Sequence, residues 1–308
     1  MDPHPRALPL ACLFAALFTT GLAADEKRTF HIVGYLPEYR LSAFDLEKAR
    51  DVTDLVYFSV EPTAEGDFTR DHVRGDALAK LQAIKAKHGL NLSLSVGGWG
   101  RSTRFPQVTA SEKVRQAFVG KLVQFCREHQ FDGIDLDWEH PSGEAERENY
   151  GRLLVELKKE GLLVTVAIAD WQGLSPAGIE AVDRVHLMAY DAPKQHSTYE
   201  YAVSAVERLI KMGVPADKIC LGVPFYGRGV EQRAKSLTYR QIVEKHDPAP
   251  TSDEVDGIYF NGLETIRRKT RLAVEKKLGG VMIWELGQDT QDERSLLRAI
   301  HRAASDRP

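Results

Sequence analysis

Cysteine is scarce in this chain of 308 residues, which has only Cys12, Cys126 and Cys220. The two cysteines beyond the first 24 residues are too few for a disulfide framework. Because Cys126 falls in a predicted helix and Cys220 in a predicted strand, we expect both to be buried free thiols. No Cys/His cluster has the spacing of metal ligands, so neither a metal nor a cofactor is predicted.

The sequence also lacks an excess of charge of either sign. It has 41 Lys and Arg against 44 Asp and Glu, a net charge of -3, and the two signs are interspersed. A nucleic-acid-binding protein usually presents a basic face, so nucleic acid is not an expected partner. Long apolar runs are missing too. The run at 7–18 is shorter than the roughly 20 residues that span a membrane.

This apolar run is typical of an export signal. Arg6 precedes it, Pro9 interrupts it, and small residues at 19–24 lead to a charged segment. We therefore predict a signal peptide over 1–24, one domain over 25–308, a secreted or periplasmic location, and no membrane attachment after cleavage. The alternatives are an uncleaved anchor or a misassigned start. Cys12 hints at a lipoprotein signal, but the apolar run continues past it.

The most informative segment is 131–139, which places four carboxylates within eight residues among strand-forming residues. Side chains alternate between the faces of a strand, so Asp135, Asp137 and Glu139 point the same way. The opposite face carries the packing residues Ile134, Leu136 and Trp138.

Three acids on one face of a buried strand do not serve stability, because each unpaired buried charge is costly. Carboxylates held close together push their pKa values apart, so one stays protonated near neutral pH while another ionises. This pattern predicts a general acid. Asp132 is three residues before Asp135, so on an alternating strand its side chain would point to the opposite face. It is interpreted as a structural residue.

Short apolar runs alternate with amphipathic stretches along the chain. The predicted strands are His31–Tyr35, Asp54–Val60, Leu90–Val96, Gly133–Trp138, Leu162–Ala169, Arg184–Met188, Lys218–Val223 and Gly280–Trp284. The predicted helices are Ala77–Lys87, Glu112–Glu128, Glu144–Lys159, Tyr199–Met212, Leu263–Lys277 and Gln291–Ala303. Alternation of this kind indicates parallel strands joined by right-handed crossovers.

An eight-stranded (β/α)8 TIM barrel and an open doubly wound sheet both fit this order. Polar and aromatic residues follow many of the strands instead of gathering at one crevice, which favours a single-domain barrel with one mouth. The only long connection runs from Arg228 to about Asn261, with a short helix possible at 236–245 and a loop at 247–253.

Five segments resemble the motifs of glycoside hydrolase family 18, the chitinase family, in the family's order. The acid strand has the form D-x-x-D-x-D-x-E. The others are Ser95-Val96-Gly97-Gly98-Trp99, Met188-Ala189-Tyr190-Asp191, the stretch Leu221 to Arg228, and the stretch Gly279 to Leu286. Gly34-Tyr35, in the first predicted strand, resembles the first strand of the family. The resemblance covers nearly the whole of 25–308.

The resemblance implies a (β/α)8 barrel and retaining hydrolysis assisted by the substrate's own N-acetyl group. Glu139 would be the general acid and base, and Asp137 would hold the acetamido N–H. Asp135 would lie behind Asp137 and share a proton with it. Tyr190 would donate to the acetamido oxygen, and Trp284 would form the floor under the sugar.

The resemblance also implies further sugar contacts, which are Tyr35, Trp99, Asp191 and Arg228. Phe58 and Tyr226, which stand at or after the ends of predicted strands, are added to this set. It assigns structural roles to Ser95, Gly97 and Gly98. Taken alone, Tyr35 and Trp99 are equally compatible with packing. His186 is interpreted as a satisfied interior histidine. A metal site built from the acids is disfavoured because ligands two apart on one strand rarely converge on one ion.

We therefore expect a monomeric enzyme that cleaves β-1,4-linked N-acetylglucosamine chains such as chitin or chito-oligosaccharides. The alternatives are the same chemistry on peptidoglycan or the N-glycan core, or a non-catalytic chitin-binding lectin. Many relatives carry a small α+β insertion between the seventh and eighth strands. Here that interval is short, so we expect the insertion to be absent or vestigial and the cleft shallow.

Overall fold

The computed structural model describes Met1 and residues 29–305. The predicted signal peptide, apart from Met1, lies outside the described residues. No helix of the described part has the length and apolar character needed to cross a membrane.

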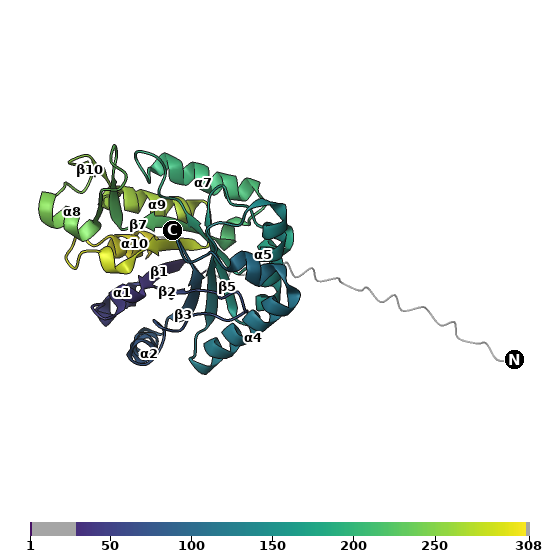
Figure 1. Ribbon diagram of the computed structural model, residues 1–308. Helices are drawn as coiled ribbons and strands as arrows, with labels where there is room; N and C mark the ends of the chain where they lie inside the picture. Colours follow the sequence, from purple (N-terminus) through teal and green to yellow (C-terminus); the bar gives the residue numbers. More distant parts are fainter. Residues whose placement is uncertain (2–28, 306–308) are drawn as a thin grey trace.

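Eight parallel strands close into a barrel in the order β1-β12-β7-β6-β5-β4-β3-β2 (Figure 1). Their bounds are β1 His31–Pro37, β2 Asp54–Val60, β3 Asn91–Gly97, β4 Gly133–Asp137, β5 Leu163–Ala169, β6 Arg184–Met188, β7 Ile219–Pro224 and β12 Gly280–Trp284. These are the eight predicted strands, with ends that differ by up to two residues. The predicted TIM barrel is confirmed.

Helices surround the barrel (Figure 1). They are α1 Glu38–Leu41, α2 Asp76–His88, α3 Phe105–Ala110, α4 Glu112–Glu128, α5 Gly143–Lys158, α6 Pro176–Ala181, α7 Tyr199–Lys211, α8 Tyr239–His246, α9 Leu263–Glu275 and α10 Leu296–Ser305. Three 3-10 turns add to them: η1 Leu46–Asp51, η2 Ala216–Lys218 and η3 Leu286–Gln288. The short α1, α3 and α6 carry too few apolar positions to show a helical period, and the sequence did not predict them.

The predicted start of the last helix at Gln291 is wrong, because α10 begins at Leu296. Asp289 explains the shift. Its carboxylate accepts hydrogen bonds from the backbone N–H groups of Leu296 and Leu297 at 2.9 and 3.1 Å, and from the Ser295 hydroxyl. An aspartate that satisfies the free N–H groups of a first turn sets where the helix begins.

The interval between β7 and β12 holds a small antiparallel sheet in the order β10-β11-β8-β9. Its strands, β8 Tyr226–Gly229, β9 Ser236–Thr238, β10 Glu254–Val255 and β11 Ile258–Tyr259, have two to four residues each. The insertion is thus vestigial, not absent. The helix expected at 236–245 is corrected to strand β9 followed by α8, because Thr238 caps α8 in a reciprocal box with Gln241.

Two hydrophobic cores follow from the alternation of side chains along the strands. The larger core lies between barrel and helices and includes Ile134 and Leu136 of β4. The smaller core lies within the barrel and contains Val33, Tyr35, Val56, Phe58, Cys220 and Met282. Cys126 and Cys220 are free and buried, as predicted.

Candidate active site

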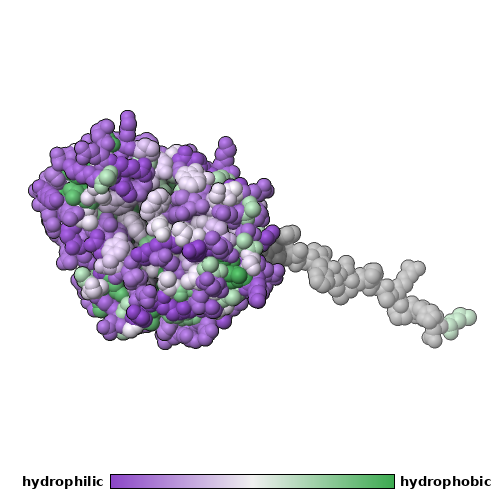
Figure 2. Space-filling model, in the orientation of Figure 1, coloured by the Kyte–Doolittle hydropathy of each residue, from purple (hydrophilic) through white to green (hydrophobic). Residues whose placement is uncertain are grey.

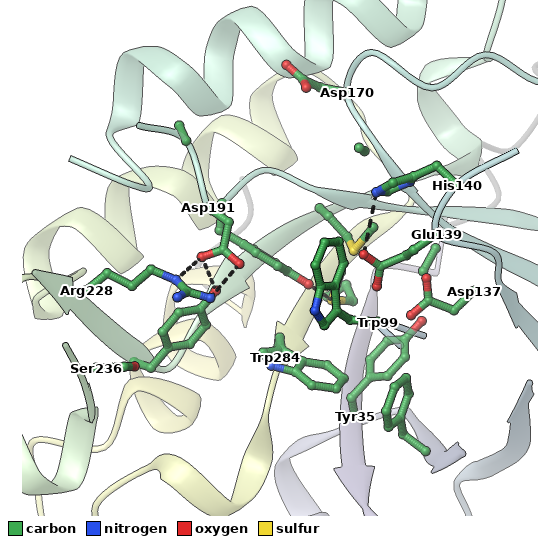
Figure 3. A pocket seen from close by; sticks show the side chains of 18 of the residues that line it. Tyr35, Trp99, Asp137, Glu139, His140, Asp170, Asp191, Arg228, Ser236 and Trp284 are labelled. Atoms are coloured by element: carbon green, nitrogen blue, oxygen red, sulfur yellow. Dashed lines mark hydrogen bonds and ion pairs between the residues drawn. The ribbon is translucent and has the colours of Figure 1, made fainter. Parts of the chain in front are cut away.

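A cavity of about 870 Å³ opens at the mouth of the barrel, at the carboxyl ends of the strands. The face in Figure 2 is largely hydrophilic, and residues of intermediate hydropathy gather near its centre. Figure 3 looks into the cavity, where Asp137 and Glu139 lie across from Asp191 and Arg228. The closed barrel therefore collects side chains from six of its strands, and from segments that follow the strands, into one site.

Asp135 lies at the base of the row of acids and is fully buried. Its carboxylate accepts hydrogen bonds from the hydroxyls of Tyr35, Ser95 and Thr165 at 2.8, 3.0 and 2.6 Å. His186 Nδ1 is 3.2 Å from Asp135 Oδ1 and 2.8 Å from the Tyr35 hydroxyl. Burial alone would raise the pKa of Asp135, but the contact with His186 and the hydrogen bonds hold it below its ordinary value. Asp135 is therefore the ionised member of the row.

Asp137 has the opposite electrostatic environment, although it stands only two positions further along β4. Its Oδ1 is buried and has no hydrogen-bond partner among the described residues. Burial raises the pKa of Asp137 well above its usual range, and the charges of Glu139 and Asp135 add to the shift. None of the hydrogen bonds of the described residues joins Asp137 to Asp135. Of the two, Asp137 is therefore the carboxyl group that favours its protonated form.

Glu139 follows β4 and reaches into the cavity (Figure 3). Its backbone N–H donates to the Ser102 hydroxyl at 3.0 Å, and its side chain is 14% exposed. Burial raises the pKa of Glu139 to about 7, and the charge of Asp191 adds to the shift. A carboxyl group that holds its proton up to neutral pH and still reaches the cavity is suited to donate that proton to a ligand.

The backbone beneath Glu139 is held by aromatic packing. Trp138 points away from the cavity, where its ring stacks on Phe105 at 5.2 Å and meets Tyr150 edge to face at 5.3 Å. The Tyr150 hydroxyl donates to the Leu136 carbonyl at 3.1 Å. These contacts fix the end of β4 and so fix the place of the acid that follows.

Two glycines allow β3 to approach this strand end. Gly97 and Gly98 have φ of +97° and +102°, and the Gly98 N–H donates to the Asp137 carbonyl at 2.6 Å. A Cβ at Gly97 would lie 2.3 Å from that carbonyl oxygen, and a Cβ at Gly98 would lie 2.2 Å from Phe58 Cζ. Both positions require glycine for its positive φ and for its lack of a side chain.

Replacing Gly98 by alanine is therefore expected to lower the free energy of unfolding by about 2–4 kcal/mol, from backbone strain plus the clash with Phe58. Gly100→Ala is the matched control, because Gly100 also has a positive φ but a Cβ there meets no atom within 4 Å. Denaturant unfolding of both variants measures the difference. Equal losses in the two variants would contradict the role of Phe58.

The floor of the cavity is aromatic. Trp284 at the end of β12 lies 4.8 Å from the Phe58 ring in an edge-on contact and 5.7 Å from the Tyr35 ring. Tyr35 is 1% exposed and Phe58 7%, so only small parts of these rings face the cavity. The Tyr35 hydroxyl is engaged by Asp135 and His186, and supports the row of acids from below.

The segment after β6 forms the opposite wall. The Asp191 carboxylate accepts hydrogen bonds from the Tyr226 hydroxyl at 2.8 Å and from Arg228 Nη2 at 3.0 Å. Burial would raise the pKa of Asp191, but His196, at 3.6 Å, and Arg228 hold it well below its usual range. Tyr190 is partly buried, and its hydroxyl has only a long contact with Met282 Sδ at 3.9 Å. The Tyr190 O–H thus remains free to donate to a ligand.

The remaining predicted residues lie in two places. Trp99 is 81% exposed at the rim of the cavity. Asp132 lies away from the cavity, where its carboxylate accepts from the Leu92 N–H at 2.8 Å and pairs with Lys85 at 2.7 Å.

The sequence analysis missed several cavity residues that follow the strands. His140 comes directly after Glu139, and Asp170 and Trp171 come directly after β5. Trp171 is 63% exposed, which is unusual for so large an apolar side chain. The rule that functional residues follow barrel strands would have found all three, had it been applied to every strand.

Comparison with known proteins agrees with this geometry. The model of the family "Glycosyl hydrolases family 18" matches residues 31–289. The chain belongs to this family. Family 18 membership makes it a glycoside hydrolase, and the matched range contains every cavity residue described above.

Relatives within family 18 are similar over most of the chain. Chitinase 1 of Aphanocladium album is 28% identical over 82% of this chain and 79% of its own length. Chitotriosidase-1 of Mus musculus is 28% identical over 68% of this chain, which spans only 61% of the mouse protein. The crystal structure of the GH18 chitinase ChiB of Flavobacterium johnsoniae has a TM-score of 0.80 and 28% identity, covering 91% of this chain and 95% of that one.

Proposed function

We propose that this protein is a retaining glycosidase that cleaves β-1,4-linked N-acetylglucosamine chains, chitin or chito-oligosaccharides, with assistance from the substrate's acetamido group. One observation carries the proposal. Three carboxyl groups in a row on β4 and just beyond it differ in environment: hydrogen bonds and His186 lower the pKa of Asp135, whereas burial raises the pKa of Asp137 and of Glu139. A proton donor and a neutral neighbour with an unpartnered oxygen match the needs of this reaction.

In the proposed reaction the acetamido oxygen of the sugar attacks its own C1. The bond from C1 to the leaving oxygen breaks, and Glu139 gives its proton to that oxygen. Asp137 holds the acetamido N–H and stabilises the positive oxazolinium ring, while Tyr190 orients the acetamido oxygen. Glu139, now a carboxylate, takes a proton from the water that opens the ring. Asp135 anchors the row, and Trp284 supports the sugar face.

Trp99, Asp191, Arg228, Tyr226, Phe58 and Tyr35 are proposed as the wider sugar contacts. The substrate assignment rests on relatives named chitinases. Peptidoglycan and the N-glycan core would use the same proton donor and remain the competing substrates. A non-catalytic lectin is the alternative of another class, and the presence of Glu139 disfavours it.

Incubation of the purified protein with chitotetraose, peptidoglycan and a high-mannose glycopeptide, with products followed by mass, tests this proposal. Cleavage of chitotetraose alone, with the β-anomer formed first, is the expected result. Cleavage of only one of the other two substrates would overturn the assignment of chitin as the substrate. Binding of a substrate with no cleavage of any of the three would favour the lectin.

The pH dependence of cleavage has a predicted sign. Glu139 must be protonated in the free enzyme to act as the acid, and its pKa is raised to about 7. The value of kcat/KM should therefore fall as the pH rises through about 7. Measuring kcat/KM on a soluble chito-oligosaccharide across the pH range locates this fall. If kcat/KM instead began to fall near pH 4.5, the ordinary pKa of a glutamate, the raised pKa of Glu139 would be contradicted.

The short insertion between β7 and β12 predicts a preference for soluble substrates. Its strands of two to four residues build only a low wall beside the cavity. A shallow groove binds few sugars of a chain pulled from a crystal. Chitopentaose should therefore be cleaved much faster than crystalline chitin at equal sugar concentration, and comparable rates would refute this expectation.

We also propose that residues 1–24 are removed on export to a secreted or periplasmic location, leaving 25–308 as a single monomeric catalytic domain. The arrangement of Arg6, the apolar run and the small residues at 19–24 supports cleavage there. Mass analysis of the exported protein tests it, and an intact N-terminus in the mature protein would contradict it.

A further inference from the structure

Two exposed tryptophans stand at the cavity, one on each side of the strand that carries the acids. Trp99 follows β3 and is 81% exposed, and Trp171 follows β5 and is 63% exposed. Both line the cavity. In the barrel order β3 and β5 are the two neighbours of β4, so the two indoles flank the strand end from which Glu139 extends. Trp99 is already among the proposed sugar contacts, whereas none of the roles proposed above uses Trp171.

Trp171 is held next to the acid by a chain of side-chain contacts. Its ring meets the His140 ring edge to face, with centroids 4.6 Å apart. His140 has its Nε2 3.6 Å from Glu139 Oε2 and its Nδ1 2.8 Å from Gln172 Oε1 (Figure 3). Gln172 is 3% exposed, and its Nε2 donates to the Trp138 carbonyl at 3.4 Å. The exposed indole therefore packs on an imidazole that a buried amide anchors beside Glu139.

The residue before Trp171 is anchored as well. Asp170 is 5% exposed, and its carboxylate pairs with Arg208 of α7. Asp170 and Tyr201 both line the cavity, and the Arg208 guanidinium lies 5.9 Å from the centre of the Tyr201 ring. Trp171 thus sits on a segment that is fixed before any ligand arrives, which keeps the entropy cost of ordering it on binding small.

An exposed indole that lines a cavity has a definite binding chemistry. The face of an aromatic ring carries a partial negative charge. A pyranose ring presents C–H groups on its faces and hydroxyls around its rim, so a sugar face stacks on an indole. Isolated exposed apolar side chains are ordinary on protein surfaces. Ile210 of α7 is one of these, at 41% exposed and outside the cavity, whereas Trp171 opens onto the cavity that holds Glu139.

The barrel order tells which part of a bound chain Trp171 would meet. Trp284, the proposed floor under the sugar that is attacked, ends β12. In the closed order of eight strands, β4 lies directly opposite β12, and β5 is next to β4. The leaving oxygen must lie within reach of Glu139, just beyond β4. The sugars attached to that oxygen therefore lie on the side of the mouth where Trp171 stands, across from Trp284.

We propose that Trp171 is a platform for a β-linked N-acetylglucosamine unit in the leaving part of the chain. The inference rests on the proposed function, since it assumes that Glu139 protonates the leaving oxygen. The indole face stacks on the sugar, and the neighbouring Asp170 carboxylate accepts hydrogen bonds from its hydroxyls. Trp171 touches no reacting atom. It determines specificity, because it favours substrates that carry sugars on the leaving side over those that carry a simple aryl group there.

The test compares kcat/KM for chitohexaose with kcat/KM for p-nitrophenyl β-chitobioside, whose leaving group contains no sugar. Trp171→Ala should lower the ratio of the two values about tenfold, the scale of one lost aromatic contact. Trp171→Phe keeps an aromatic face and should hold the ratio within about threefold of the unaltered protein. Ile210→Ala is the control, because it removes an exposed apolar side chain outside the cavity. An unchanged ratio in Trp171→Ala would overturn the proposal, and equal losses in the alanine and phenylalanine variants would overturn the stacking.

A second measurement does not depend on hydrolysis. Calorimetry measures the binding of chitohexaose to Glu139→Gln and to the same variant with Trp171→Ala added. The added change should weaken binding about tenfold, and an unaltered affinity would overturn the proposal. If chitohexaose is bound but never cleaved, the proposed function fails while this comparison still decides the role of Trp171. If chitohexaose is cleaved and neither the ratio nor the affinity responds to Trp171→Ala, only the platform fails.

Discussion

Replacing Glu139 by glutamine should remove nearly all hydrolysis while leaving oligosaccharide binding largely intact. The amide keeps the shape of the carboxyl group but cannot deliver a proton to the leaving oxygen. The loss in kcat is expected to be on the order of 10³-fold, within the range of general acid–base catalysis. Single-turnover cleavage of chitotetraose, together with calorimetric binding of the same ligand, measures the two effects separately.

Glu148→Gln is the matched control for this variant. Glu148 is an exposed residue of α5, so the same change of charge there should leave the rate unaltered. A Glu139→Gln enzyme that turned over near the unaltered rate would remove the proton donor from the proposed reaction. Loss of binding in parallel with loss of rate would instead indicate a disturbed cavity.

Asp137→Asn should lower kcat by about 10²- to 10³-fold, the scale of a lost electrostatic contact at a transition state. Asp137 is buried beside Glu139, and its Oδ1 has no partner among the described residues, so it is available to accept a hydrogen bond from a ligand. An asparagine retains the shape but cannot pass a proton to Asp135 and so become the carboxylate that stabilises the oxazolinium ring. The expected signature is a large fall in kcat, a small change in KM, and weaker inhibition by a thiazoline analogue of the intermediate.

Asp132→Asn is the control within the same acid-rich segment. Asp132 bonds the Leu92 N–H and Lys85 away from the cavity, so the variant should retain its rate and lose only about 1 kcal/mol of stability. Equal losses of rate in the Asp137 and Asp132 variants would contradict the division of roles along this segment.

Much of the fold could be predicted because it follows from local periodicity. All eight barrel strands are short apolar runs, and the alternation along β4 correctly separated Asp135 and Asp137 from Ile134 and Leu136. The start of α10 and the strands of the small sheet could not be predicted. The start of α10 depends on hydrogen bonds from the Leu296 and Leu297 N–H groups to the Asp289 carboxylate. The strands of the small sheet have two to four residues each, which is too short to show a period.

Site residues could be predicted from the sequence only where they belong to recognisable motifs. Asp137, Glu139, Tyr190 and Trp284 belong to recognisable segments and line one cavity. His140, Gln172 and Trp171 form their contacts across the loops after β4 and β5. Nothing in their spacing along the chain indicates that an imidazole bridges the acid and a buried amide.

The order of residues in this chain by itself determined eight parallel strands and the row of carboxyl groups on the fourth, since side-chain alternation depends only on neighbours along the backbone. Only the tertiary structure decided which of those carboxyl groups favours its protonated form. Hydroxyls and an imidazole from β1, β3, β5 and β6 surround Asp135, whereas Asp137 is buried without a partner among the described residues. A pKa is set by burial and by charges brought together from distant parts of the chain.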